Sequence, residues 1–196
     1  MNTASPQVSE TLHIQTASFQ ILAEISWVLG KVSQSEVEDF LREIAHADVI
    51  VACGAGRVGM AVRGFAMRLG HLGKNAHMLG DATVPSIGKG DLLIVASGSG
   101  ETQTIFDIVA IAHKNGARVA LVTGNIESKM GKLAHAVVHL PAPSKTKQVE
   151  GFTSSQPMTT LNEQCLGILF DAMVLMLMGQ MKETHDTMWA RHSNLE

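Results

Sequence analysis

The chain of 196 residues is poor in aromatic side chains and carries little net charge. It has no tyrosine, two tryptophans and six phenylalanines, and its net charge is −3 with a pI near 6.3. Proteins that bind nucleic acids present basic patches, and those that bind single strands also present aromatic rings on which bases stack. The scarcity of both argues against a nucleic-acid partner and favours a small molecule as the ligand.

Cysteine is also scarce, because only Cys53 and Cys165 are present. Each lies in an apolar stretch, which fits buried reduced thiols better than a disulfide framework. The first residues lack the basic head and apolar core of a secretory signal, so we expect a cytoplasmic protein. The apolar segment from Leu166 to Met178 is short and contains Asp171, so we expect no membrane span and no membrane partner.

Apolar runs alternate with helical patterns along most of the chain. Two helical patterns come first, roughly Val8 to Leu29 and Ser35 to Ala45, and the second opens with a cap-like Ser35. The apolar runs that follow are VIVAC, AHML, LLIVA, VALV and AVVHL, and helical patterns occupy 58–71, 102–115 and 128–133 between them. This alternation predicts an α/β fold in which helices cover a parallel sheet.

Two more segments complete the predicted domain. Residues 141–159 contain three prolines among scattered serines and threonines, which predicts a loop long enough to suspect a function. Residues 160–181 predict a last long helix, and a polar tail follows it. We therefore expect one domain over 1–196, with helices at about 8–45, the sheet and its helices at about 48–140, the loop, and the final helix with its tail at 160–196.

The segment DLLIVASGSGET, residues 91–102, has the layout of an anion-binding site. Its apolar run suits a strand covered on both faces, and helical spacing begins at Thr102. Glycine lets a ligand approach the backbone, the helix N-terminus offers unpaired N–H groups, and Ser97, Ser99 and Thr102 can donate hydroxyl hydrogen bonds. These features predict a phosphate site, although Ser99 and Thr102 are also common helix caps.

A second glycine loop, CGAGRVG, follows the first apolar run. Gly54, Gly56 and Gly59 match the G-x-G-x-x-G pattern of dinucleotide sites, and Asp81 lies about where such sites place an acid for the ribose. One interpretation is therefore an NAD(P)-binding oxidoreductase. The other is that the two glycine loops hold the two ends of one small phosphorylated ligand, with Arg57 as a charged contact.

The chain resembles the 6-phospho-3-hexuloisomerase family of the sugar isomerase (SIS) superfamily in six segments: CGAGRVG, AMRLGHLG, GDATVP, GDLLIVASGSGET, QPMTTLNEQ and RHSNLE. The resemblance covers nearly the whole chain. It implies an SIS-type three-layer sandwich with a five-stranded parallel sheet in a flavodoxin-like or Rossmann-like order. It also implies a homotetramer with the active site at a subunit interface, and interconversion of 3-hexulose 6-phosphate and fructose 6-phosphate without a metal or an organic cofactor.

The resemblance also assigns roles to individual residues. The superfamily's phosphate loop falls on five of them: Ser97, Gly98, Ser99, Gly100 and Thr102. The family's catalytic glutamate falls on Glu163, and the tail histidine, which in the family reaches toward a neighbouring subunit, falls on His192. From their positions, we expect further substrate contacts from Gly56, Arg57, Asp81 and Thr83.

The implied chemistry needs a base, because moving a carbonyl from C3 to C2 passes through a cis-enediol or enediolate. Glu163 is the candidate, although Thr160-x-x-Glu163 also fits a helix capping box. His192 could protonate an enediolate oxygen or assist the opening of a cyclic sugar. Two departures from the family bear on substrate preference, since this chain has Asp81 where relatives often carry glutamate and Asn162 where many carry phenylalanine.

Two other interpretations of the sequence concern ligands and catalysis. His135 and His139 stand four residues apart without a cysteine or carboxylate in a recognisable metal pattern, so we predict no metal site. A non-catalytic SIS module that senses a sugar phosphate is a third possible function, beside the isomerase and the oxidoreductase. It predicts ligand binding without turnover and no effect of changing Glu163.

Overall fold

Five short strands form one parallel sheet in a computed structural model that describes residues 12–144 and 148–195. The strands are β1 (Ile50–Cys53), β2 (Ala76–Met78), β3 (Leu92–Ser97), β4 (Arg118–Thr123) and β5 (Ala136–His139), in the order β2-β1-β3-β4-β5. Every residue of β1 and β3 is buried, because helices cover both faces of the sheet. The predicted five-stranded parallel sheet is confirmed, and its strand order is the flavodoxin-like one.

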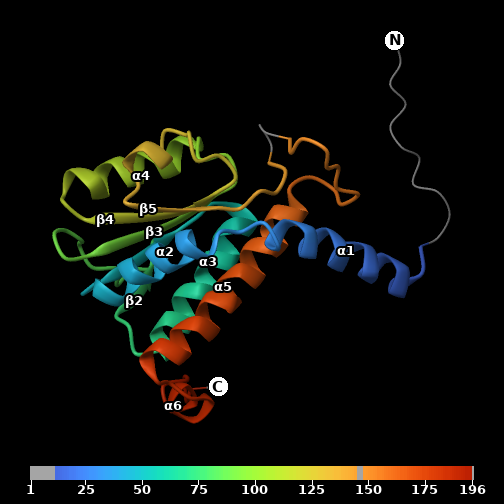
Figure 1. The fold of residues 1–196 in the computed structure, drawn as a ribbon. Coiled ribbons are helices and arrows are strands. Elements are labelled where there is room, and N and C mark those ends of the chain that lie inside the picture. Colours follow the sequence, from blue (N-terminus) through green and yellow to red (C-terminus); the bar gives the residue numbers. More distant parts are fainter. Residues whose placement is uncertain (1–11, 145–147, 196) are drawn as a thin grey trace.

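Helices cover the two faces of the sheet unequally (Figure 1). One face carries α4 (Gln103–Lys114) and the short 3₁₀ turn η1 (Gly131–Leu133), and the other carries α2 (Gln34–His46), α3 (Gly56–His71) and α5 (Thr160–Met181). Side chains alternate between the faces of a strand, so Val51 and Leu93 join the apolar cluster around α4. Their neighbours Ile50 and Leu92 join the larger cluster around α3 and α5. The three-layer arrangement is thereby confirmed.

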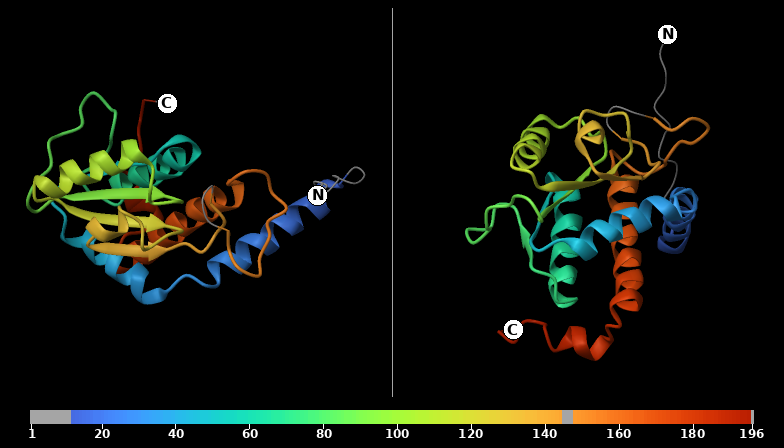
Figure 2. Two further views of the ribbon diagram at one scale, coloured as in Figure 1. Left: turned by 90° about the horizontal axis from the view of Figure 1, so that it is seen from above. Right: turned by 60° about the vertical axis from the view of Figure 1, so that its left-hand side comes forward.

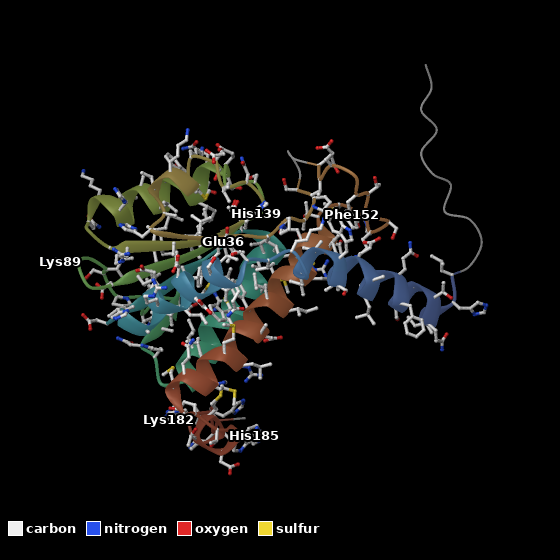
Figure 3. All side chains as sticks on the ribbon, viewed as in Figure 1. Glu36, Lys89, His139, Phe152, Lys182 and His185 are labelled. Atoms are coloured by element: carbon white, nitrogen blue, oxygen red, sulfur yellow. The ribbon has the colours of Figure 1, made fainter. Side chains whose placement is uncertain are left out.

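Two helices lie at the margins of this sandwich (Figure 2). The C-terminal half of α1 (Ile14–Leu29) packs on α5, and its residues Glu24, Ile25 and Val28 are buried. The N-terminal half of α1 extends beyond the body of the domain. The last helix, α6 (His185–Trp189), lies with the tail beyond the C-terminal end of α5. The carboxylate of Glu36 on α2 accepts a hydrogen bond of 2.8 Å from the backbone N–H of His139 at the end of β5 (Figure 3).

The start of the second helix differs from the prediction. Ser33 is its N-cap, because the Ser33 hydroxyl accepts a hydrogen bond of 3.4 Å from the backbone N–H of Glu36. The predicted cap at Ser35 is therefore wrong. The first helix was predicted from Val8, which lies outside the described residues, and within them it begins at Ile14.

The helix predicted over 128–133 is wrong, since only the 3₁₀ turn η1 forms there. The hydroxyl of Ser128 accepts a hydrogen bond of 3.2 Å from the N–H of Gly131. Such a local bond from side chain to backbone competes with the regular bonds of a helix. The segment serves as a tight connection between β4 and β5.

The last helix is a core helix with an unusually apolar sequence. At 22 residues and a mean hydropathy of 1.5 over its most apolar window, α5 is long and apolar enough to cross a bilayer, and it exceeds the short segment noted in the sequence. In the structure it packs against α1 and α3, and the Phe170 ring stacks on Phe65 with centroids 4.3 Å apart. Core helices of globular proteins commonly have this composition, so it is weak evidence for a membrane span.

Both cysteines are buried and free, as the sequence predicted. Burial raises the pKa of the Cys53 thiol to about 12, and mainly the same cause raises the pKa of Cys165 to about 12. Neither sulfur is therefore a thiolate at neutral pH, so neither is a reactive nucleophile.

The stacked pair of Phe65 and Phe170 joins α3 to α5 in the core, so we expect Phe170→Ala to lower the free energy of unfolding by about 3–5 kcal/mol. Denaturant titration followed by circular dichroism measures this. Ile111→Ala is the control, because Ile111 is 61% exposed, and it should change stability by less than about 0.5 kcal/mol. Equal shifts for the two variants would show that the pair is not a central contact of the core.

Candidate active site

The strand order reverses between β1 and β3, and this reversal positions the site. After β1 the chain crosses to β2 on one side, whereas after β3 it continues to β4 on the other. The loops at the carboxyl ends of β1 and β3 therefore diverge, and ligands of open parallel sheets bind in the crevice that such a divergence leaves. A cavity of about 500 Å³ opens there, a size that suits a small metabolite.

The cavity brings together both glycine loops and the predicted base. Seven of the residues singled out in the sequence line it: Gly56, Arg57, Ser97, Gly98, Ser99, Thr102 and Glu163. Another part of the wall comes from the segment that precedes α5, through Ser144, Met158 and Thr159, and from Asn162 in the first turn of that helix. The predicted loop over 141–159 thus borders the cavity, apart from 145–147, which lie outside the described residues.

Three helix N-termini converge on the cavity. α3 begins at Gly56, Thr102 is the N-cap residue of α4, and α5 begins at Thr160, and all three residues line the cavity. The first turn of each helix leaves backbone N–H groups without intrahelical partners and carries a partial positive charge. Together they make the cavity a favourable place for a phosphate.

The loop after β3 is held in the shape that an anion site needs. The Ser97 hydroxyl accepts a hydrogen bond of 3.2 Å from the N–H of Gly100, which has φ of +66°. A Cβ atom on Gly100 would lie 2.0 Å from the hydroxyl oxygen of Ser128, so no other residue fits at this position. Gly100 does not line the cavity itself, and it shapes the turn that does.

The hydroxyls of this loop do not serve as ordinary helix caps. Thr102 occupies the N-cap position of α4, but its side chain makes no capping hydrogen bond. The Ser99 hydroxyl accepts a hydrogen bond of 3.2 Å from the N–H of Glu101, which precedes the helix. Thr102 thus stands at the N-cap position without capping through its hydroxyl, Ser99 is not the cap of α4, and both residues line the cavity.

Glu163 stands on the first turn of α5, where two contacts orient its carboxylate. Its side chain is 15% exposed and forms an ion pair of 3.2 Å with Arg57 in the first turn of α3. The hydroxyl of Thr159 donates a hydrogen bond of 3.0 Å to the other carboxylate oxygen. Thr159, not Thr160, is the N-cap of α5, so the predicted capping box of Thr160 and Glu163 is wrong.

Two residues that nothing in the sequence marked as ligands lie beside the phosphate loop. A Cβ atom on Gly98 would be 3.3 Å from the amide oxygen of Asn162 and 3.5 Å from Cβ of Ser144. Both side chains are nearly buried, at 3% exposed for Asn162 and 6% for Ser144. Asn162 appeared in the sequence only as a departure from the family, and Ser144 had no signal beyond its place in a long loop.

Two predicted contacts lie outside the cavity. Asp81 and Thr83 follow β2, are both exposed, and are not among the residues that line the cavity. The Asp81 carboxylate pairs with Arg63 on the outer part of α3 at 3.0 Å. Because β2 is the edge strand, its loop lies one strand away from the reversal point. The expected contacts of these two residues with a ligand are therefore not made in this cavity.

His192 lies at the opposite end of α3 from the cavity. Its ring is 5.2 Å from that of His71 and 5.0 Å from that of Trp189. The tail is fastened there by Arg191, which donates a hydrogen bond of 3.0 Å to the backbone oxygen of His71. The 16 residues of α3 span about 24 Å, so His192 does not reach the cavity of its own chain.

A buried carboxylate fastens the loop that leads into α5. Glu24 of α1 accepts four hydrogen bonds, from the hydroxyls of Ser154 and Ser155, the backbone N–H of Ser155 and the side-chain amide of Gln156. Burial alone would raise the pKa of Glu24, but these donors outweigh it and the net pKa lies below its ordinary value. These four hydrogen bonds anchor the loop to α1. Farther along the loop, Met158 precedes Thr159 and has φ of +58°, a backbone conformation that residues with side chains rarely adopt.

Comparison with known proteins bears on the same residues. The SIS domain family matches residues 43–168, a range that includes both glycine loops and Glu163. The 3-hexulose-6-phosphate isomerase of Bacillus subtilis is 37% identical over 177 residues, which cover 90% of this chain and 96% of that protein. The enzyme of the same name from Mycobacterium gastri is 39% identical over 173 residues, covering 88% and 86%. These matches confirm the family resemblance seen in the sequence.

Solved structures agree with the fold. A hypothetical protein of Methanococcus jannaschii, whose crystal structure was used to infer a molecular function of 3-hexulose-6-phosphate isomerase, superposes with a TM-score of 0.77. It is 26% identical, and the match covers 93% of this chain and 98% of that one. Another hypothetical protein, at 32% identity, has a TM-score of 0.82 over 91% of this chain and 97% of its own.

Glu24→Gln tests the anchor of the loop. Because the pKa of Glu24 is below its ordinary 4.5 in the folded chain, the ionised carboxylate stabilises the fold above about pH 4.5, and this contribution is lost as the pH falls further. At pH 7 the variant should lose about 1–3 kcal/mol of stability, and the difference from the wild type should shrink toward pH 4. Thermal melts from pH 4 to 8 measure it, with the exposed Glu38→Gln as control. A difference that is independent of pH would contradict the assignment.

Proposed function

The chain belongs to the SIS domain family, and on that premise we propose that it is a sugar-phosphate isomerase that interconverts 3-hexulose 6-phosphate and fructose 6-phosphate. One observation carries the proposal: the carboxylate of Glu163 lies in the same cavity as the phosphate loop and the N-termini of three helices. The cavity thus has a place for an anion and, beside it, a base that can act on the sugar.

Glu163 takes the proton from C2 of the 3-hexulose, and the electron pair of that C–H bond forms the C2–C3 double bond of a cis-enediolate. The proton of the C2 hydroxyl passes to the oxygen on C3, and the same carboxyl group then returns its proton to C3 while the carbonyl forms at C2. One base suffices because the two carbons are adjacent and a single face of the enediolate is presented to it. The hydrogen bond from Thr159 and the ion pair with Arg57 fix the carboxylate in place.

Arg57 has a second role in this proposal. Its guanidinium is 3.2 Å from Glu163, and its side chain is 53% exposed, so it can turn toward a substrate oxygen. Negative charge develops on the oxygen attached to C3 when the proton leaves C2, and a cation held near the base stabilises that charge. Ser97, Ser99 and Thr102 hold the phosphate together with the backbone of Gly98 and the start of α4.

The oxidoreductase interpretation is not favoured. Gly54, Gly56 and Gly59 do run from the end of β1 into the first turn of α3 as the dinucleotide pattern requires. The acid that would bind the ribose, Asp81, is however paired with Arg63 outside the cavity. Two curated relatives that match over most of the chain are named as isomerases. The sensor interpretation predicts that the protein binds the sugar phosphate without turnover. Proton exchange in deuterium oxide distinguishes it from the isomerase.

We further propose that the protein is a homotetramer in the cytoplasm and that the site is completed by a neighbouring subunit. Large apolar side chains are exposed on two helices that pack together, Phe19 and Leu22 on α1 and Ile168 and Leu175 on α5. Contact with another copy would remove them from water. A neighbouring tail would then bring its His192 to the cavity, where it can protonate an enediolate oxygen.

Isomerisation in deuterium oxide tests the reaction and the base together. The wild type should exchange the proton on C3 of fructose 6-phosphate and leave those on C1, because the proposed enediolate spans C2 and C3. Glu163→Gln keeps the side-chain shape and removes the base, so its rate of exchange should fall by about a hundredfold to ten-thousandfold.

The exposed Glu127→Gln is the matched control for this experiment and should keep the wild-type rate. NMR follows the C1 and C3 signals. Exchange at C1 alone would contradict the proposed C2–C3 enediolate and indicate an isomerase that acts between C1 and C2. A folded wild type that binds the sugar phosphate without exchange would favour the sensor.

Mixing two inactive variants tests the shared site. Glu163→Gln and His192→Ala subunits, each tagged differently and reassembled together, should regain part of the wild-type activity, since a cavity with Glu163 from one variant and His192 from the other is complete. Mixed oligomers that are recovered through both tags and remain inactive would contradict a site that is shared between subunits.

A further inference from the structure

The side chain of Asn162 has a buried amide nitrogen without a hydrogen-bond partner among the described residues. It is 3% exposed, and its amide nitrogen lies in the interior with no partner among the described residues. Buried polar side chains are nearly always hydrogen-bonded, because an unsatisfied amide loses its bonds to water and gains nothing in return. The unpartnered amide of Asn162 therefore indicates a hydrogen-bond partner that is not part of the protein, such as a ligand.

The surroundings of Asn162 indicate where that partner lies. The residue lines the cavity, one position before Glu163 on the first turn of α5. Its amide oxygen is 3.3 Å from where a Cβ atom of Gly98 would be, so the carboxamide faces the middle of the phosphate loop. A half-turn about the terminal bond exchanges the positions of the two groups, so the NH2 group with its two N–H donors can face Gly98 while the oxygen takes the interior position.

We propose that Asn162 determines substrate specificity by donating a hydrogen bond from its NH2 group to an oxygen of the sugar phosphate bound against Gly98. The inference rests on the proposed function and adds to it the residue that selects the ligand. An anionic or hydroxyl oxygen accepts this bond, whereas a ligand without an oxygen there leaves the amide unsatisfied. Selection against ligands that leave a buried group unpaired is strong.

Asn162→Leu is the direct test, because leucine has nearly the same shape and no polar atoms. If the amide serves the ligand, the affinity for fructose 6-phosphate measured by calorimetry should fall by about tenfold or more, and KM should rise more than kcat falls. The melting temperature without ligand should stay the same or increase, since an unsatisfied buried amide has been removed.

Gln164 supplies a matched control on the same helix. Its amide oxygen is also buried without a partner among the described residues, but Gln164 does not line the cavity. Gln164→Leu should leave the affinity within about twofold of the wild type. Competition by inorganic phosphate separates the two possible acceptors: weaker binding of phosphate by Asn162→Leu identifies a phosphate oxygen, and unchanged binding identifies a sugar hydroxyl.

The outcomes distinguish this inference from the proposed function. Unchanged affinity in Asn162→Leu, or a fall in affinity that only parallels a fall in melting temperature, overturns the specificity role while the wild type remains an isomerase. Asn162→Asp, which keeps the shape and adds a negative charge, covers the case in which the leucine variant does not fold, and wild-type affinity in it would overturn the role as well. A wild type that neither binds nor exchanges fructose 6-phosphate overturns the proposed function and this inference together.

Discussion

The site depends on one constraint, the reversal of strand order between β1 and β3. Because the connections leave these two strands in opposite directions, the loops at their carboxyl ends separate and leave a crevice that neither helix layer fills. Both loops lead directly into helices, so the crevice is lined by helix N-termini. The affinity for an anion is therefore a property of the backbone, and the side chains of the loops refine it.

The proposed base, Glu163, belongs to neither of these loops but to α5, and its position depends on contacts far from the sheet edge. α5 brings its first turn to the crevice because its apolar face packs on α3 and α1. The segment before it is tied to α1 by the carboxylate of Glu24 and by the stacking of Phe152 on Trp27, with centroids 4.0 Å apart. The core and the anchor thus fix Glu163 relative to the phosphate loop.

The parts of this arrangement that could be predicted from the sequence are those with local signals. The apolar runs are unbroken because the strands are covered on both faces, and the SGSGET segment carries its glycines, hydroxyls and helix start within a few residues. Glu163 was different, because its local pattern fits a helix cap and only the family resemblance marked it as the base. The cap in the structure is Thr159, whose hydroxyl bonds to that carboxylate.

The features that could not be predicted arise from contacts between distant parts of the chain. Glu24 and Ser154 are 130 positions apart, and Arg57 and Glu163 are 106 apart. No periodicity or motif reports such pairs, because they depend on how the layers pack. Asp81 and Thr83 were placed near the ligand by sequence position alone, whereas the edge location of β2 keeps them out of the cavity.

A crystal structure of the protein with fructose 6-phosphate bound tests the central claim most directly. The account predicts the phosphate against Gly98 and the start of α4, with C2 and C3 of the open-chain sugar within reach of the Glu163 carboxylate. A phosphate bound elsewhere, or a sugar whose C2 and C3 lie away from Glu163, would contradict it.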